Sequence, residues 1–514
     1  MDLRCLREVG DSIAVEGDRL KKFTRRFRTD CAIIASMLKR TKIVATLGPA
    51  SDDHDTLCRM IKSGLDVARL NFSHGEAADH LRRADILRSA AQTCGREIGI
   101  MGDLQGPKIR IMRFREHSVS LADGDAFFLD STLGLMDGDQ EGVGVALDTL
   151  HQDVAPGDIL LLNDGLITLQ VERIEGTRIH TLVINGGILS DHKGINLKGG
   201  GLSAAALTDV DKDNIKIAAD MGVDFLAVSF VRNGEDVEEA RTLLREAGGH
   251  GLIVAKVERA EAVTNIDSII DAADVIMVAR GDLGVEIGYA ELIGIQKKLI
   301  RKTRKAHKIV ITATQMMESM IHNPIPTRAE VSDVSNAVID GTDAVMLSGE
   351  TAVGDYPAEA IAAMSDVCIG AEKFPIPVSR TSHRMEDHFQ LVDEAIAAAT
   401  MYTANHMSVK AIIALTESGS TTRWMSRIRS DIPIYAFTPH RATRRRVAMY
   451  RGVFPVSFEI KAGDSRRLYQ DIFDTLLSNN LVVVGDRAIL TKGDLDGVSG
   501  STNSMTVIEI KSSE

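Results

Sequence analysis

Short apolar runs rich in β-branched residues alternate with longer amphipathic stretches along most of this 514-residue chain. Strands that alternate with helical stretches form parallel sheets, and strands buried on both faces read as continuous apolar runs. Eight runs of this kind therefore predict a closed (β/α)8 barrel. The runs are Ile43–Leu47, Val67–Leu70, Ile98–Met101, Phe225–Val228, Leu252–Ala255, Val275–Val278, Ile309–Ile311 and Ala344–Leu347.

About a hundred residues separate the third run from the fourth, many more than a crossover helix needs. Apolar and polar residues alternate in Ser118–Leu129 and again in Ile167–Ile184, with Gly and Asp turns between them. Alternation with a period of two is typical of strands that have one buried face. We therefore predict an all-β lid domain at 110–206, inserted between barrel segments 40–109 and 207–378, over the carboxyl-terminal mouth of the barrel.

Both ends of the chain differ from the barrel pattern, which stops near Pro375. The helical stretch Val392–His406 precedes the apolar run Ala411–Leu415, and helical and strand patterns alternate from there to the end. We expect a separate open α/β domain at 379–514. Residues 1–39 lack clean periodicity, so we expect an N-terminal extension without ordered structure.

Charge and composition argue against several classes of function. The formal net charge of −12 disfavours a nucleic-acid or membrane surface as the main partner. No apolar run reaches the roughly 18 residues that a membrane helix needs. The five cysteines are far apart and form no CxxC motif, which predicts isolated, reduced thiols in a cytoplasmic protein.

Polar side chains follow five of the eight predicted strands, on the side where such barrels carry their active sites. Several form i, i+2 pairs, which point to one face of a strand. Two carboxylates from neighbouring strands suit Mg²⁺, and a lysine and arginines beside them suit a phosphoryl group in transfer. Each residue alone is typical of a solvated surface or a helix cap, so only the whole set indicates an active site. The set is Arg69, Asn71, Ser73, Asp103, Lys256, Glu258, Arg280, Asp282, Thr312 and Thr314.

Other motifs are incomplete. Asp209–Asn214 begins like a calcium-binding loop but lacks the glycine and the glutamate that such a loop requires, so we expect a helix cap. Gly199–Gly201 is a turn and not a dinucleotide fingerprint. The sequence has no GxxxxGK followed by Ser or Thr, and no HRD with DFG, so it lacks both common nucleotide cradles of kinases.

Eight stretches of the chain carry a family resemblance, namely Thr41–Pro49, Arg69–Gly75, Gly102–Arg110, Ala255–Glu258, Met277–Gly284, Ile311–Met320, Pro326–Glu330 and Asp340–Thr351. In these stretches the sequence resembles the pyruvate kinase family, and the resemblance extends from about Lys39 to the C-terminus. The resemblance implies transfer of the phosphoryl group of phosphoenolpyruvate to ADP, giving pyruvate and ATP in the last step of glycolysis. It also implies a cytoplasmic homotetramer with a barrel, a lid and a C-terminal effector domain.

The resemblance implies a role for each matching site residue. The expected catalytic residues are Lys256, Arg69 and Thr314, and the substrate contacts add Gly281 and Asp282. The Mg²⁺ ligands would be Glu258 and Asp282. The residues on the nucleotide side would be Asn71, Phe72, Ser73, His74, Arg110 and, from the lid, Lys193. The family's K⁺ site corresponds to Asn71, Ser73, Asp103 and the main-chain carbonyl of Leu104.

The sequence departs from the family pattern beside the K⁺ site. Members that require K⁺ typically have Thr-Lys-Gly-Pro-Glu after the aspartate, whereas this chain has Leu-Gln-Gly-Pro-Lys at Leu104–Lys108. A fixed ammonium in place of a carboxylate supplies positive charge and repels K⁺. The alternative interpretation of Lys108 is a solvated lysine at the lid hinge with no role in the site. We expect Mg²⁺ as the cofactor and activity that is independent of K⁺.

The segment Thr416–Thr422 follows a predicted strand and opens a predicted helix. Hydroxyls and main-chain N–H groups in this position form a phosphate site in some proteins and an ordinary capped turn in others. The local pattern favours neither. The resemblance favours an allosteric site for AMP or a sugar monophosphate, as in bacterial members of the family. The site would comprise Thr416, Ser418, Gly419, Ser420, Thr421 and Thr422, with Arg441, Arg444, Arg445 and Arg446 beside it.

Two other functions compete with this interpretation. A Mg²⁺-dependent pyruvate aldolase on a similar barrel would also need Glu258 and Asp282, but neither Lys256 between them nor a lid. A degenerate sensor that keeps only the function of the C-terminal domain would have lost at least one of the catalytic-site residues. Four of these are present, namely Arg69, Lys256, Glu258 and Asp282.

Overall fold

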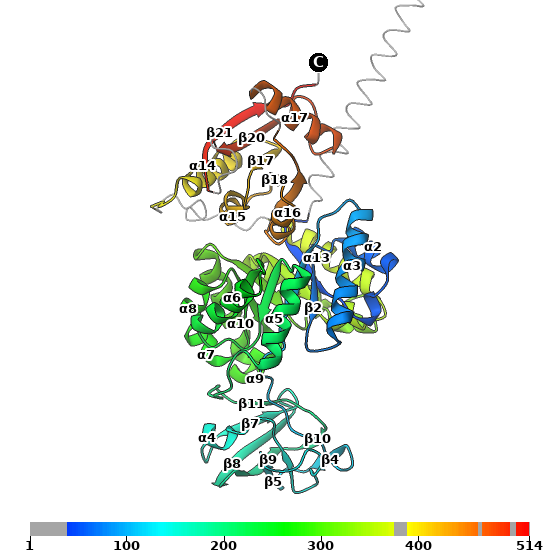
Figure 1. Ribbon diagram of the computed structural model, residues 1–514, viewed down its shortest axis with the longest axis vertical. Helices are drawn as coiled ribbons and strands as arrows, with labels where there is room; N and C mark the ends of the chain where they lie inside the picture. The colour runs from blue at the N-terminus through cyan, green and yellow to red at the C-terminus, as the bar shows by residue number, and fades with distance from the viewer. Residues whose placement is uncertain (1–38, 375–387, 461–464, 494–499, 513–514) are drawn as a thin grey trace, which may run out of the picture. The chain divides into compact units, whose positions relative to one another are not determined.

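The computed structural model describes residues 39–374, 388–460, 465–493 and 500–512 (Figure 1). Thr41–Ala371 form one compact unit, and Arg40 belongs with the residues from Glu372 onward to a second unit. The expected N-terminal extension lies outside the described residues, apart from Lys39. The boundaries of the four expected domains stay predictions.

The first unit contains the predicted barrel. Its strands form a closed parallel sheet in the order β1-β16-β15-β14-β13-β12-β3-β2. Every predicted run falls on one of these strands to within two residues at each end, so the fold class is confirmed. The strands are β1 (Lys42–Thr46), β2 (Val67–Asn71), β3 (Gly99–Asp103), β12 (Phe225–Val228), β13 (Leu252–Val257), β14 (Val275–Ala279), β15 (Ile309–Ala313) and β16 (Ala344–Leu347).

Helices alternate with the barrel strands and surround the sheet (Figure 1). α5 begins after Thr208, whose hydroxyl accepts from Asp211 N, while the Asp211 side chain accepts from Thr208 N, so the calcium-like segment is a helix cap as expected. Among the described residues, no helix is both long and apolar enough to cross a membrane. The helices of this unit are η1 (Pro49–Ser51), α2 (His54–Ser63), α3 (Ala77–Thr93), α5 (Asp209–Met221), α6 (Gly234–Glu246), α7 (Ala260–Thr264), α8 (Ile266–Ala272), α9 (Arg280–Ile287), α10 (Tyr289–Lys305), η2 (Glu318–Ile321), α11 (Arg328–Asp340), α12 (Gly349–Ala352) and α13 (Pro357–Glu372).

A repeated aspartate ties neighbouring barrel strands together at their amino-terminal ends. One aspartate directly precedes each of β2, β12, β14 and β16, and its Oδ2 accepts a hydrogen bond of 2.9 Å from a main-chain N–H of an adjacent strand. Polar residues at this face of a barrel serve stability, because the chemistry lies at the opposite face. The aspartates are Asp66, Asp224, Asp274 and Asp343, and their donors are Ile43, Ile100, Ile253 and Val310.

The insertion between β3 and β12 is an all-β domain, as expected. Its larger sheet has the order β11-β7-β8-β9-β5-β6, and β10 pairs with β4 beside it. Buried residues alternate with partly exposed ones at the start of β8, as the sequence pattern predicts. The elements are β4 (Ser118–Leu121), β5 (Ala126–Asp130), β6 (Gly142–Gly144), α4 (Leu150–Asp153), β7 (Ile159–Leu162), β8 (Ile167–Glu175), β9 (Arg178–Asn185), β10 (Gly187–Ser190) and β11 (Ile195–Leu197).

The second unit contains the expected open α/β domain. Its sheet has the order β19-β18-β17-β20-β21, and only β21 runs antiparallel to its neighbour. The predicted helix Val392–His406 and strand Ala411–Leu415 have those bounds in the structure. The elements are α14 (Val392–His406), β17 (Ala411–Leu415), α15 (Ser420–Ser426), β18 (Ile434–Thr438), α16 (Arg441–Val447), β19 (Val453–Ser457), α17 (Ser465–Ser478), β20 (Arg487–Gly493) and β21 (Thr502–Glu509).

Candidate active site

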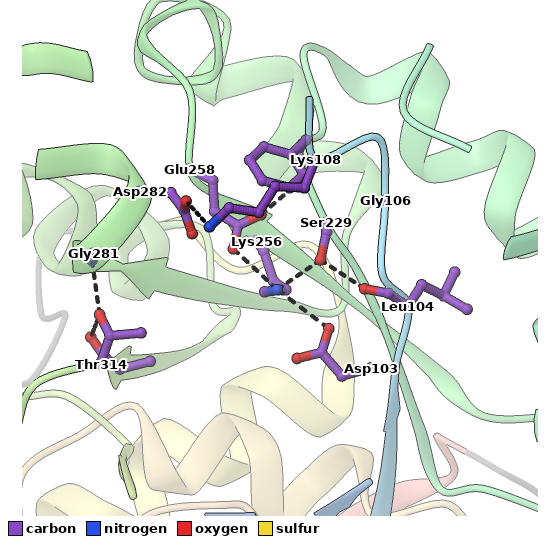
Figure 2. Close-up of polar contacts among 12 residues, drawn as sticks. Asp103, Leu104, Gly106, Lys108, Ser229, Lys256, Glu258, Gly281, Asp282 and Thr314 are labelled. Carbon is purple, nitrogen blue, oxygen red and sulfur yellow. Dashed lines mark hydrogen bonds and ion pairs between the residues drawn. The ribbon is translucent and has the colours of Figure 1, made fainter. Parts of the chain in front are cut away.

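Two ion pairs and a hydroxyl hold the side chain of Lys256 at the carboxyl-terminal ends of the barrel strands (Figure 2). Lys256 belongs to β13, and its Nζ lies 3.0 Å from Glu258 Oε1 and 3.3 Å from Asp103 Oδ1. The same ammonium donates a hydrogen bond of 2.6 Å to Ser229 Oγ. All four residues are buried. Because a buried charge is tolerated only when it is paired, the two carboxylates fix this ammonium in place.

Arg69 binds the second oxygen of the Asp103 carboxylate. Its Nε donates to Asp103 Oδ2 at 2.5 Å, and its Nη1 donates to Thr46 Oγ1 at 2.9 Å. Thr46, Arg69 and Asp103 come from the adjacent strands β1, β2 and β3. The two cations Lys256 and Arg69 thus lie on either side of the buried carboxylate of Asp103. Two cations at one site suit a multiply charged anionic substrate.

Burial and charge act in opposite directions on the pKa values of these groups. Burial by itself would raise the pKa of Asp103, but Arg69 and Lys256 hold it below its usual value. Burial would lower the pKa of Lys256, but Asp103 and Glu258 hold it above its usual value. The pKa of Glu258 is raised by burial and by the carboxylates of Asp282 and Asp103, against the opposing effect of Lys256. A cation beside Glu258 would therefore stabilise its ionised form.

The carboxylates of Glu258 and Asp282 fit the requirements of Mg²⁺. Within the described ranges, no three or more His, Cys, Asp or Glu side chains form a group that could hold a metal ion without other ligands. Mg²⁺ needs no such cage, because it binds through one or two carboxylates and takes its other oxygens from water and substrate. Glu258 Oε2 accepts from Phe230 N at 2.9 Å, and Asp282 Oδ1 pairs with Lys108 Nζ at 3.0 Å (Figure 2). The pair offers oxygen ligands only, which favours magnesium over zinc.

Thr314 lies in a strained turn at the end of β15. Its φ of 68° is in the left-handed region, which a β-branched residue rarely adopts. The Thr314 hydroxyl accepts from Gly281 N at 2.8 Å and donates to Ala313 O at 2.6 Å. Arg280 supports the turn, because its Nη2 donates to Thr314 O at 2.8 Å while its Nη1 pairs with Asp333 at 2.7 Å. Strain that neighbouring residues maintain in this way is common at functional sites.

Two family models match the chain and together cover the barrel with its insertion and most of the second unit. The model of the pyruvate kinase barrel domain matches residues 38–361, and that of the pyruvate kinase alpha/beta domain matches residues 394–508. The chain belongs to the pyruvate kinase family. It is therefore a phosphotransferase with pyruvate kinase activity, in a family that generally requires Mg²⁺ and usually K⁺.

Relatives in this family match the chain over most of its length. Pyruvate kinase II of Salmonella typhimurium is 54% identical over 478 residues, which cover 92% of this chain and 99% of that protein. The pyruvate kinase of Haemophilus influenzae is 56% identical over 424 residues, 82% of this chain and 88% of that protein. The pyruvate kinase of Geobacillus stearothermophilus is 41% identical over 474 residues, 92% of this chain and 80% of that protein. The similarity thus extends through the barrel, the insertion and the C-terminal domain.

The residues expected on the nucleotide side of a pyruvate kinase fall into two groups. Asn71 is the last residue of β2, and Phe72, Ser73 and His74 follow it. Asn71 Oδ1 accepts from Ser73 N at 3.2 Å, Phe72 is buried and His74 is exposed. Arg110 and Lys193 belong to the paired segments that lead into and out of the lid. Arg110 Nη1 donates to His192 O at 2.9 Å, and Lys193 O accepts from Ile111 N at 2.9 Å.

Two of the expected ligands of K⁺, the carboxylate of Asp103 and the carbonyl of Leu104, already have protein partners. Asn71 lies opposite Asp103 in the β2–β3 register, and Phe72 N donates to Asp103 O at 2.9 Å. The carboxylate of Asp103 binds the two cations described above, and Leu104 O accepts from Ser229 Oγ at 2.8 Å. Positive charge is therefore built into this corner of the site.

A buried glutamate joins the lid to the barrel. Glu286, in α9, accepts from Ala260 N at 2.9 Å and from the lid residue Asn196 through Nδ2 at 3.3 Å. Its main-chain oxygen accepts from Gly199 N at 3.0 Å. Burial raises the pKa of Glu286 to about 7, with a further contribution from Glu261. The ionised carboxylate is thus disfavoured at the lid–barrel junction.

We expect the Glu286→Gln substitution to stabilise the protein at pH 8 but not near pH 4.5. A carboxyl group whose folded pKa is raised contributes stability below its unfolded pKa near 4.5 and loses it as the pH rises through 7. Glutamine resembles the protonated acid, so its advantage should grow to about 3 kcal/mol above pH 7. Thermal unfolding midpoints across this pH range test this, with exposed Glu291→Gln as the control. An effect of Glu286→Gln that does not vary with pH would contradict the assignment.

The expected effector loop connects β17 to α15. Gly419 has a φ of 86°, and an added Cβ there would lie 2.7 Å from Val447, so this turn requires glycine. Gly419 N donates to Thr416 Oγ1 at 3.0 Å, and Thr422 Oγ1 donates to Gly419 O at 2.8 Å. Thr421 Oγ1 is 2.7 Å from the hydroxyl of Thr502. The three threonines therefore hold the loop in shape.

Ser420 and the arginines of α16 differ in their contacts and in their exposure to solvent. Ser420 Oγ donates to Asp393 Oδ2 at 3.3 Å. Arg444 is buried and donates to the main-chain oxygens of Thr438 and Pro439, so its contacts stabilise the turn before α16. Arg441 is exposed, and Arg445 and Arg446 are partly exposed.

Two expectations at the barrel mouth are wrong. Thr312 is buried within β15 and donates to Thr342 Oγ1 at 3.0 Å, so its side chain packs in the barrel wall. The i, i+2 argument fails for Arg280 and Asp282, because β14 ends at Ala279 and α9 begins at Arg280. Arg280 consequently supports the Thr314 turn, while Asp282 contacts Lys108.

Sequence reasoning also missed two residues that touch the site. Ser229 directly follows the fourth strand and links Lys256 to the carbonyl of Leu104. Thr46 ends the first strand and binds Arg69. Both hydroxyls stand at carboxyl-terminal strand ends, which is the same signal that identified the other residues.

Proposed function

We propose that Lys256, Arg69 and Thr314 are the catalytic residues for phosphoryl transfer from phosphoenolpyruvate to ADP. The observation that best supports this is the buried ammonium of Lys256, fixed between two carboxylates at the barrel mouth. Lys256 and Arg69 stabilise the negative charge of the phosphoryl group and of the enolate as transfer proceeds. Thr314, with Gly281 and Asp282, contacts the enolpyruvate, and a water near its hydroxyl delivers the proton to the enolate.

Glu258 and Asp282 hold Mg²⁺ in this proposal. When bound, the ion neutralises charge on the carboxylate and phosphoryl oxygens of the substrate. Lys108, which pairs with Asp282, orients that carboxylate from the side of the lid. The residues of the chain therefore prepare an oxygen-lined, cation-rich pocket before substrate arrives.

ADP binds on the side formed by Asn71, Phe72, Ser73, His74, Arg110 and Lys193. Because Arg110 and Lys193 belong to the lid segments, closure of the lid brings positive charge to the nucleotide phosphates. Closure also excludes water, so that the phosphoryl group passes to ADP and is not hydrolysed.

A coupled assay tests the proposed reaction. With phosphoenolpyruvate, ADP and Mg²⁺, we expect pyruvate and ATP to form in equal amounts. Pyruvate release from a 4-hydroxy-2-oxo acid in the absence of ADP would favour the aldolase alternative. Absence of turnover in either assay, with phosphometabolite binding retained, would favour the sensor.

We further propose that activity is independent of K⁺. The ammonium of Lys108 lies 3.0 Å from Asp282 Oδ1 and supplies fixed positive charge beside the expected substrate site. Asn71, Ser73, Asp103 and Leu104 then shape the pocket without holding a cation.

The third proposal is allosteric activation by AMP or a sugar monophosphate at Thr416–Thr422. The family resemblance supports this, and the hydroxyl of Ser420 stands at the start of α15. In this proposal the hydroxyls of Ser418 and Ser420 contact the phosphate, and Ser420 exchanges its hydrogen bond to Asp393 Oδ2 for one to the ligand. Exposed Arg441 adds positive charge nearby.

The double substitution Ser418→Ala plus Ser420→Ala should weaken activation. Loss of two hydrogen bonds to a charged phosphate should raise the activator concentration for half-maximal effect by about tenfold or more. Turnover without activator should stay unchanged. Titrations with AMP and with glucose 6-phosphate measure the effect, and exposed Ser408→Ala is the matched control. Unchanged activation by both compounds would disprove the site.

We also propose a cytoplasmic homotetramer, and the family resemblance is its support. Light scattering coupled to size-exclusion chromatography measures the assembly directly. A monomeric, fully active protein would contradict it.

A further inference from the structure

Two cysteines that are far apart in the sequence meet between helices α2 and α3. Cys58 lies within α2 and is buried, and Cys94 directly follows α3 and is partly exposed. Both are free thiols in the structure. The expectation of isolated cysteines is therefore wrong for this pair, because the packing of α2 on α3 closes a separation of 36 residues.

The contacts of the two sulfur atoms are reciprocal. Cys94 Sγ donates to the main-chain oxygen of Cys58 at 3.8 Å. Cys58 Sγ donates at 3.8 Å to Ala90 O, the same oxygen that accepts from Cys94 N at 2.9 Å. Each sulfur thus lies over the main chain beside the other cysteine.

A histidine completes the cluster. His54 Nδ1 is 3.8 Å from Cys58 Sγ, and its Nε2 is 3.2 Å from Thr93 Oγ1, the residue before Cys94. Imidazole next to a thiol is able to accept the thiol proton. Burial and the neighbouring Cys94 thiol raise the pKa of Cys58, which favours its protonated thiol form until the group that it attacks is present.

We propose that Cys58 and Cys94 form a reversible disulfide when the protein meets a peroxide. The partly exposed Cys94 attacks hydrogen peroxide through its sulfur, so that an S–O bond forms, the O–O bond breaks and one water leaves. Cys58 then loses its proton to His54 and attacks the Cys94 sulfenic acid. The S–S bond forms, the S–O bond breaks and a second water leaves with the proton. Two thiols are oxidised by two electrons in total, and the peroxide is reduced to two waters.

The cysteine pair contains none of the proposed catalytic residues. It lies between the two helices that precede and follow β2, the strand that carries Arg69 and Asn71. The other described cysteine, Cys368, is fully buried in α13 and provides an internal comparison. The remaining cysteines, Cys5 and Cys31, lie outside the described residues.

Peptide mapping of the full-length chain tests the disulfide. The protein, with Cys5 and Cys31 replaced by serine and Cys368 kept as the comparison, is treated with equimolar hydrogen peroxide, alkylated and digested without reductant. We expect a cross-linked peptide that joins Cys58 to Cys94, lacks two hydrogens and separates again with dithiothreitol. Alkylation of both thiols, or oxidation of Cys94 to sulfinic acid without a cross-link, would overturn the proposal.

Single substitutions test the order of events. In Cys58→Ser, Cys94 should accumulate as a sulfenic acid that dimedone traps, whereas Cys58 in Cys94→Ser should stay a thiol. His54→Ala should slow the cross-link by about tenfold or more, because the Cys58 proton then lacks its acceptor. Dimedone labelling of Cys58 in the Cys94→Ser variant would reverse the assigned roles.

Discussion

Replacement of Lys256 by methionine should reduce turnover by about 10²–10³-fold or more, because it removes a cation aimed at charge that develops in the transition state. Lys256 Nζ is held by Glu258, Asp103 and Ser229, and the methionine side chain offers none of these three residues a hydrogen-bond donor. The affinities for phosphoenolpyruvate and Mg²⁺ should change far less, because Glu258 and Asp282 remain. Steady-state kinetics with phosphoenolpyruvate and ADP measure both effects.

Two further measurements separate catalysis from folding in this experiment. Lys256→Met leaves Asp103 and Glu258 buried without one of their cations, which also destabilises the fold. Thermal unfolding therefore has to accompany the kinetics. Lys297→Met breaks an ion pair with Asp340 on the surface of α10 and should keep full turnover. Near-normal turnover of a folded Lys256→Met protein would remove this lysine from the mechanism.

The barrel was predictable because its signal is local and repeated. Each predicted run is apolar on both faces, and each becomes a strand of the closed sheet, as Phe225–Val228 and Ala344–Leu347 illustrate with identical bounds. The rule that chemistry follows the carboxyl-terminal strand ends then brought Arg69, Asp103, Lys256 and Glu258 together. The structure joins these residues through direct contacts.

What sequence reasoning missed depends on where strands end and on how helices pack. The direction of the Arg280 side chain depends on whether this residue continues β14 or starts α9. Strand periodicity alone does not locate the boundary between the two elements. The meeting of Cys58 with Cys94 follows from the packing of α2 on α3, which neither helix encodes by itself. Buried hydroxyls such as Ser229 give no periodic signal, and only their position after a strand distinguishes them.

The substitution Lys108→Glu should make the enzyme depend on K⁺. In the unmodified protein the Lys108 ammonium neutralises part of the charge of Asp282 at 3.0 Å. A glutamate in its place would put a second carboxylate beside Asp282, and repulsion between them costs about 2–3 kcal/mol for partly exposed groups. A monovalent cation relieves that repulsion. We therefore expect turnover to fall by about 10²-fold in tetramethylammonium buffer and to recover when K⁺ is added.

The comparison with Lys108→Met separates loss of the ammonium from gain of a carboxylate. Methionine removes the positive charge without creating an oxygen ligand for a cation. The turnover of Lys108→Met should therefore fall, and K⁺ should not restore it. In the unmodified protein, Arg69, Lys256 and Lys108 already surround Asp103 and Asp282 with cations, so K⁺ should change turnover by less than about twofold. A strong requirement for K⁺ in the unmodified enzyme would refute the explanation, because fixed ammonium charge would then not replace the ion.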